Sequence, residues 1–124
     1  MRSIINSFAN AWRGVKIFVR RERNAWIHCG MTILVILAGF LFRISMAEWL
    51  AVVFAIGLVL AGEAINTAIE RLSDVVQPEQ DDRIRDVKDV SAGAVLICAI
   101  TAAVIGVIVF LPKLLSWFCL VIGL

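Results

Sequence analysis

Residues 49–70 read WLAVVFAIGLVLAGEAINTAIE, and this stretch decides how the chain folds. Its apolar part, residues 49–62, is 14 residues long, whereas a helix needs about 20 residues to cross a bilayer. Glu63 must therefore lie inside the membrane boundary or at its edge. A carboxylate there is costly unless it has a partner or a task, so this position indicates a functional site.

The polar residues of this stretch share one face of the predicted helix. Glu63, Asn66, Thr67 and Glu70 recur at spacings of three, four and seven, which places them on one stripe. The two carboxylates stand roughly 10 Å apart along the helix axis. The stripe thus runs from lipid depth into the cytoplasm, where a lipid head group and a water-soluble ligand can meet.

The composition is that of a membrane protein. The chain has 124 residues, 61% of them hydrophobic, and a mean hydropathy of +0.93, whereas soluble domains are about half apolar. A separate soluble catalytic domain needs on the order of 100 residues, so any chemistry must come from the spans, their ends and short loops. One small protomer encloses little space, and we therefore expect self-association; we expect no nucleic-acid partner.

The basic residues predict the orientation of the chain. They concentrate before the first span and in a second polar segment, residues 71–89, and only Arg43 and Lys113 lie elsewhere. Because cytoplasmic loops carry an excess of Lys and Arg, we place the amino terminus and residues 71–89 in the cytoplasm and the carboxyl terminus outside.

The sequence predicts an all-α membrane protein with one surface helix and three spans. An amphipathic interfacial helix is expected over residues 1–25. The expected spans are residues 26–42, 47–70 and 90–111, with a break in the polar segment at Gln77 and Pro78. The third span is expected to end at Pro112, and the apolar tail, residues 112–124, either lies at the far interface or extends the last helix.

The charged residues leave more than one function open. Carboxylates with water suit Mg²⁺, and phosphoryl transfer needs a metal, a cation and a positioned base. No glycine-rich phosphate loop of the kind found in soluble nucleotide-binding proteins is present. The same residues allow a small transporter that uses Glu63 as a proton or ion site. They also allow a structural subunit in which Glu63 and Asn66 hold protomers together.

A resemblance to a known family favours phosphoryl transfer over the transporter and the structural subunit. Residues 63–70, EAINTAIE, followed by Asp74 and by residues 87–97, VKDVSAGAVLI, closely resemble the bacterial integral-membrane diacylglycerol kinase family, which includes the undecaprenol kinases. Residues 7–14, SFANAWRG, and 22–24, ERN, are similar to its amino-terminal pattern. His28 and residues 91–94, SAGA, look more like the undecaprenol kinase branch. On the residues alone, His28 at the span entrance is a hydrogen-bonded interfacial residue.

The resemblance implies a homotrimer in the bacterial inner membrane, with active sites shared between protomers. It implies transfer of the ATP γ-phosphoryl group to the primary hydroxyl of diacylglycerol or undecaprenol. By position, Glu63 matches the general base, and Glu22 and Glu70 match the Mg²⁺ ligands. Residues of the nucleotide and catalytic site are matched by Asn66, Lys88 and Asp89, with Asp89 expected to hold Lys88 or Asn66. Further nucleotide contacts are implied for Asn10, Glu79, Gln80 and Asp81.

Overall fold

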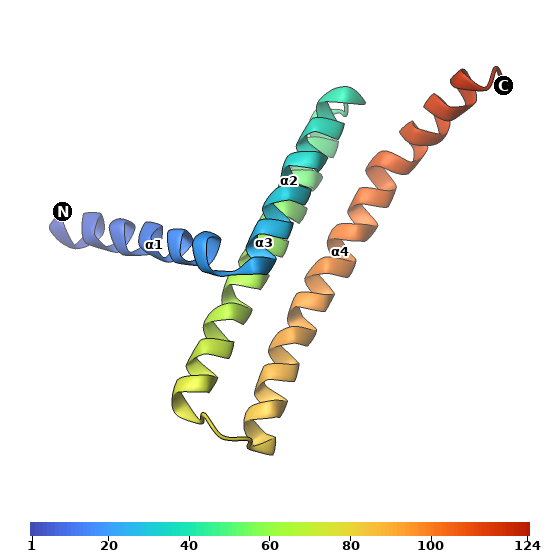
Figure 1. The fold of residues 1–124 in the computed structure, drawn as a ribbon. Helices are drawn as coiled ribbons and strands as arrows, with labels where there is room; N and C mark the ends of the chain where they lie inside the picture. Colours follow the sequence, from blue (N-terminus) through green and yellow to red (C-terminus); the bar gives the residue numbers. More distant parts are fainter.

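The computed structural model describes residues 1–124 as four α-helices without a strand. The helices are α1 (Arg2–Arg21), α2 (Arg23–Leu41), α3 (Met46–Val76) and α4 (Asp82–Val121). Figure 1 shows α2 and α3 lying side by side, α4 running along α3, and α1 projecting sideways from the other three. The all-α fold class is confirmed.

Three of the helices, α2, α3 and α4, are long and apolar enough to cross a membrane. Within the single chain only 9 of 124 residues are buried, and most large apolar side chains point outward. An apolar surface of this extent is not stable in water and requires lipid or neighbouring copies to cover it. The number of spans therefore agrees with the sequence prediction.

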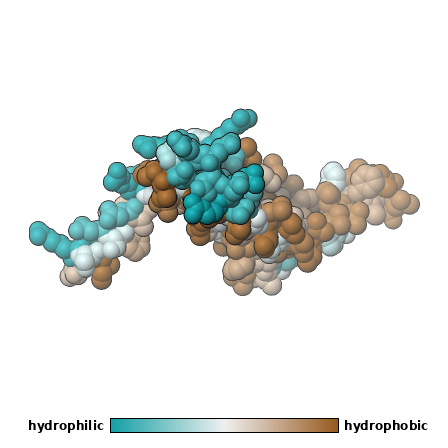
Figure 2. Space-filling view, turned by 90° about the horizontal axis from the view of Figure 1, so that it is seen from below, coloured by the Kyte–Doolittle hydropathy of each residue, from teal (hydrophilic) through white to brown (hydrophobic).

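Helix α1 has the character of a surface helix. None of its residues is buried, and Figure 2 shows a hydrophilic side and a hydrophobic side along it. The helix ends at Arg21, four residues before the expected end, because Glu22 adopts an extended conformation (φ −106°, ψ 122°). This one extended residue turns the chain from α1 into α2, which starts at Arg23 rather than at Trp26.

A short turn joins α2 to α3 and makes the two helices antiparallel. Arg43 takes up a left-handed conformation (φ 51°), and Ser45 then caps α3. The Glu48 N–H donates to the Ser45 hydroxyl (3.2 Å), and the Ser45 N–H donates to the Glu48 carboxylate (3.0 Å). This reciprocal capping box satisfies two backbone donors at the helix start. Lys113 of α4 pairs with Glu48 at 3.1 Å, so all three spans are tied at this end.

Helices α2 and α3 approach closely at Gly39. A Cβ atom built on Gly39 would lie 2.5 Å from the ring of Trp49, which stacks obliquely on Phe40. Below this contact, Val52 of α3 packs with Ile44 and Val109 in the only cluster of buried apolar side chains. The absence of a side chain at Gly39 therefore sets how near the two helices lie.

We expect Gly39→Ala to lower the thermal stability of the folded protein. The added methyl group would overlap the Trp49 ring, and overpacking of this kind costs about 1–3 kcal/mol. Gly30→Ala on the same helix is the control, because a Cβ there meets nothing within 4 Å and alanine favours the helix. Thermal unfolding in detergent is followed by circular dichroism. We expect the unfolding temperature of Gly39→Ala to lie below that of wild type, and that of Gly30→Ala to equal or exceed it. Equal unfolding temperatures would contradict the contact.

The loop between α3 and α4 lies where the sequence predicts it. Helix α3 ends at Val76, before Gln77 and Pro78, and the Asp81 carboxylate caps α4 by accepting the Arg83 N–H at 2.8 Å. The Arg83 side chain also donates to Asp81, and these bonds lower the pKa of Asp81 to about 2. Figure 2 looks onto this end of the molecule, where hydrophilic side chains gather.

We expected the third span to end at Pro112, and this prediction is wrong. Helix α4 continues through Pro112 to Val121. Proline removes one backbone hydrogen bond from a helix, and spanning helices tolerate this loss where nearby groups compensate. The bond that Pro112 cannot make is the one to the Ile108 carbonyl, and the helix continues on both sides of this gap. Of the two alternatives for the tail, the structure shows extension of the last helix.

Candidate functional site

Glu63 is buried and has a partner. Only 6% of its surface is exposed, and its Oε1 atom lies 2.9 Å from Nε2 of His28 on α2. A buried carboxylate is costly without a hydrogen-bond donor, and the imidazole supplies one. The Glu63 side chain therefore points into the protein, toward α2, rather than outward from the helices.

Asn66 faces a different helix. Its Oδ1 atom accepts a hydrogen bond from the hydroxyl of Ser91 on α4 at 2.7 Å, and Ser91 is 7% exposed. Three positions along a helix fall about 60° short of a full turn, so Glu63 and Asn66 diverge slightly around α3. The polar stripe thus contacts α2 through one residue and α4 through the other.

Lys88 and Asp89 do not interact as we expected. Lys88 forms an ion pair with Asp74 of α3, whereas Asp89 is exposed and has no side-chain hydrogen bond. The expectation that Asp89 holds Lys88 or Asn66 is therefore wrong for the single chain. Consecutive helical residues point about 100° apart, and in the single chain Lys88 faces α3 while Asp89 points away to solvent.

The two expected metal ligands are related through Arg71 of α3. Glu22, at the corner between α1 and α2, accepts a hydrogen bond from the Arg71 guanidinium, and Arg71 follows Glu70 directly. Glu70 is exposed. No group of three or more His, Cys, Asp or Glu side chains forms a metal site within one chain. Two carboxylates suit Mg²⁺ nonetheless, because this ion usually keeps several waters and takes only one or two protein carboxylates.

The residues implied for nucleotide binding lie apart in the single chain. Asn10 is exposed on α1, and α1 contacts only α2 and α3. Glu79 and Gln80 are exposed in the loop before α4, and Asp81 is engaged as the cap of that helix. One chain therefore does not bring Asn10 together with the start of α4.

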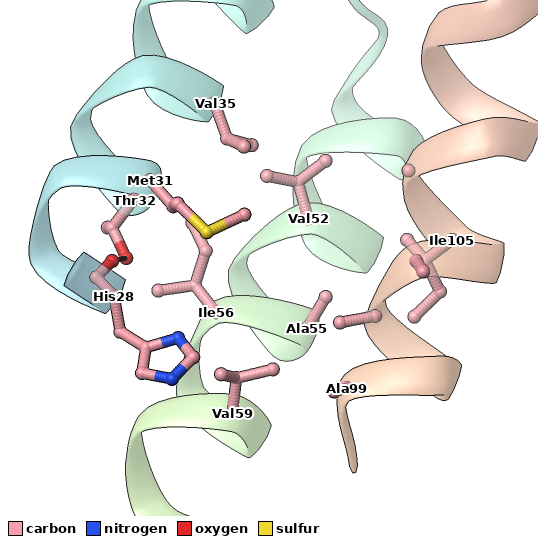
Figure 3. A pocket seen from close by; sticks show the side chains of 13 residues that line it. His28, Met31, Thr32, Val35, Val52, Ala55, Ile56, Val59, Ala99 and Ile105 are labelled. Carbon is pink, nitrogen blue, oxygen red and sulfur yellow. Dashed lines mark hydrogen bonds between the residues drawn. The ribbon is translucent and has the colours of Figure 1, made fainter. Parts of the chain in front are cut away.

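An apolar cavity of about 290 Å³ opens beside the buried pair, between α2, α3 and α4 (Figure 3). His28 lies at one end of it, and Val52 and Ile56 line the α3 side. Its α4 wall is formed by small residues, Ala99, Ala102, Ala103 and Gly106, together with Ile105. The cavity therefore combines a hydrocarbon-like interior with one polar end that reaches Glu63.

A second cavity of about 630 Å³ lies between α3 and α4 nearer the polar end of the molecule. Asn66 and Ser91 line it, together with Asp86 at the start of α4. Its walls are also largely apolar, with Gly62 and Cys98 in close approach across it. The second cavity therefore borders the polar stripe of α3 at Asn66, whereas the first cavity reaches the stripe only through His28, the partner of Glu63.

The sequence did not reveal the partners of the site residues. Arg71, Ser91 and Asp74 are bonded to Glu22, Asn66 and Lys88, and none was singled out as a partner beforehand. For His28 the expectation of a hydrogen-bonded residue was made, but its partner lies 35 positions away. The sequence offered only one indication of these partners: each of them is a polar residue within or next to an apolar span.

The site and the fold together define an integral-membrane protein with polar contacts between its spanning helices. The sequence matches the family described as prokaryotic diacylglycerol kinase over residues 9–110. It is 35% identical to the undecaprenol kinase of Bacillus subtilis over 92% of this chain and 93% of that protein. It is 33% identical to the diacylglycerol kinase of Synechocystis over 92% of this chain and 66% of that protein.

The chain belongs to the prokaryotic diacylglycerol kinase family. It is an integral-membrane lipid kinase, as the resemblance implied, and both relatives are named as kinases rather than transporters. Membership of a kinase family implies ATP as the co-substrate.

Proposed function

We propose that this kinase transfers the γ-phosphoryl group of ATP to the primary hydroxyl of undecaprenol, with Glu63 as the general base. The main support for this proposal is the Glu63 carboxylate, which is 6% exposed and whose partner His28 lines an apolar cavity between the spans. The full-length similarity to an undecaprenol kinase supports this choice of lipid.

The polarity of the cavity favours a long isoprenoid alcohol over diacylglycerol. Apart from His28, the only polar lining residue is Thr32, whose hydroxyl already donates to the His28 carbonyl at 2.7 Å. An isoprenoid alcohol is hydrocarbon up to its hydroxyl group. Diacylglycerol carries two ester groups beside its hydroxyl, and their carbonyls would find no free donor on these walls.

In the proposed reaction Glu63 accepts the proton of the lipid hydroxyl through the carboxylate oxygen that His28 leaves free. As the lipid oxygen forms its bond to the γ-phosphorus, the bond from that phosphorus to the bridging oxygen breaks, and its electron pair leaves with ADP. Little covalent chemistry falls to the protein, so positioning and electrostatics carry most of the catalysis.

Asn66 of the stripe and Lys88 of α4 would bind the phosphates. Because Asn66 accepts from Ser91 through its oxygen, its amide N–H groups remain available as donors. Lys88, now paired with Asp74, would offset phosphate charge, and the exposed Asp89 would complete the nucleotide and catalytic site. Asn10, Glu79, Gln80 and Asp81 are proposed as further nucleotide contacts.

Glu22 and Glu70 are the proposed Mg²⁺ ligands. Arg71, which follows Glu70 directly, holds Glu22, and carboxylate oxygens are the ligands that this ion prefers. When bound, Mg²⁺ neutralises charge on the phosphate oxygens, while the two side chains orient it.

We further propose a homotrimer in the bacterial inner membrane, with the amino terminus and residues 71–89 cytoplasmic and the carboxyl terminus outside. The outward apolar faces of the spans and the separation of α1 from α4 support a site completed by a second copy. The positive-inside rule supports the orientation.

Transfer of ³²P from labelled ATP to extracted lipid tests the proposal. The purified full-length protein, reconstituted with Mg²⁺, is offered undecaprenol and diacylglycerol in separate reactions. We expect label in undecaprenol at the higher kcat/KM. Preferential labelling of diacylglycerol would overturn the choice of lipid, and no labelling of either lipid would overturn the proposed function.

We expect Ala102→Leu to raise the KM for the lipid about tenfold and to leave the KM for ATP unchanged. The larger side chain would fill part of the cavity, and pocket changes of this size are worth about 1–3 kcal/mol. Ala47→Leu, the same change at an exposed position outside the cavity, is the control. Initial rates at varied lipid and ATP measure both constants. An unchanged lipid KM would show that the chain binds elsewhere.

A further inference from the structure

The pair formed by Glu63 and His28 is the most enclosed polar contact between two spans that involves an acid. The two side chains are 8% and 22% exposed, and neither has another side-chain partner. The roles assigned above to Glu63 would not by themselves require a histidine. The second member of the pair therefore needs its own explanation.

His28 is held so that its ring reaches α3. It lies within α2, where the Thr32 hydroxyl bonds its backbone carbonyl, and its ring points from α2 toward Val59 at the end of the apolar cavity (Figure 3). Nε2 is the atom within bonding distance of Glu63, so this nitrogen carries the proton when His28 donates to a carboxylate. The bond leaves the second carboxylate oxygen of Glu63 unbonded within the chain.

We propose that His28 is a positioning residue for Glu63. Its Nε2–H donates to Oε1, restrains the carboxylate against rotation, and directs the free oxygen to the place where the lipid hydroxyl arrives. This inference rests on the proposed function, because it concerns the same base. It assigns His28 no contact with the reacting atoms, and its effect on the reaction passes through Glu63.

The competing explanation is that His28 only joins α2 to α3. A purely structural bond between helices would affect folding and activity together. A positioning bond would affect the turnover number while nucleotide affinity and assembly remain. Misplacement of a catalytic group by about 1 Å can cost roughly a hundredfold in rate, so the two explanations differ measurably.

Two amide substitutions separate them. The amide nitrogen of glutamine reaches about as far as Nε2 of histidine, whereas that of asparagine reaches only about as far as Nδ1. His28→Gln therefore retains a donor to Glu63, and His28→Asn removes it at equal polarity and charge. We expect His28→Asn to lower kcat about 10- to 100-fold with the KM for ATP unchanged, and His28→Gln to keep kcat within about threefold of wild type.

Cys29→Ala, at the adjacent position of α2, is the control, because Cys29 makes no side-chain hydrogen bond and does not line the cavity. All variants are assayed by ³²P transfer to undecaprenol, and their unfolding temperature and oligomeric size are measured in detergent. Equal kcat values for both amide variants, whether high or low, would overturn the proposal, as would a loss of kcat that follows a loss of assembly. If the wild-type protein labels no lipid, the proposed function fails. If the wild-type protein labels undecaprenol and His28→Asn has the same kcat, only this inference fails.

Discussion

Replacing Glu63 by Gln is expected to lower kcat about 10²- to 10⁴-fold, the range that general bases contribute. The amide oxygen of glutamine can still accept the hydrogen bond from His28, so the buried pair stays satisfied. The amide cannot take the proton of the lipid hydroxyl. Folding, assembly and ATP affinity should therefore remain close to those of wild type.

Glu48→Gln is the matched control for this variant. Glu48 lies at the other end of α3, in the capping box and the ion pair with Lys113. Loss of the Glu48 charge in this variant should lower the stability of the fold slightly and leave kcat unchanged. Initial rates of ³²P transfer, with nucleotide binding measured separately, check both variants. A Glu63→Gln enzyme with a near-normal rate would show that another group accepts the proton.

The second large effect is expected for Glu70→Ala. Glu70 is exposed and has no side-chain hydrogen bond, so its truncation should not disturb the fold. Removal of one of two carboxylate ligands should raise the Mg²⁺ concentration for half-maximal activity at least tenfold, because even the loss of a residue that only hydrogen-bonds to a metal ligand costs about 10- to 100-fold in affinity or activity. Turnover at saturating Mg²⁺ should recover in part.

Asp82→Asn serves as the control for charge alone, because Asp82 is an exposed acid on the same end of the molecule and is not a proposed ligand. The Mg²⁺ dependence of the rate is measured at fixed ATP for both variants. Glu22→Gln should shift this dependence in the same direction as Glu70→Ala. Combining them should cost less than the sum of the single effects in free energy, because the two side chains serve one ion. An unchanged Mg²⁺ dependence in Glu70→Ala would remove Glu70 from the site.

Hydropathy and helical periodicity predicted most of the fold. The three spans and the break before Pro78 follow from runs of apolar residues and from proline, which are local properties of the chain. The end of α1 could not be predicted, because residues 20–24, RRERN, are all polar and contain no apolar position that marks where the helix stops. The continuation through Pro112 escaped prediction because the loss of one hydrogen bond does not by itself end a long apolar helix.

By itself the sequence determined that the chain has three helices able to cross the membrane, that Glu63 follows the apolar part of the second one, and which polar residues share its stripe. These conclusions depend on length, hydropathy and residue spacing along one helix. Only the tertiary structure decided that Glu63 meets His28, that Asn66 meets Ser91, and that Glu22 meets Arg71. Such pairs depend on how separate helices are rotated and how closely they approach. That geometry comes from contacts such as Gly39 against Trp49, and no periodicity within a single helix contains it.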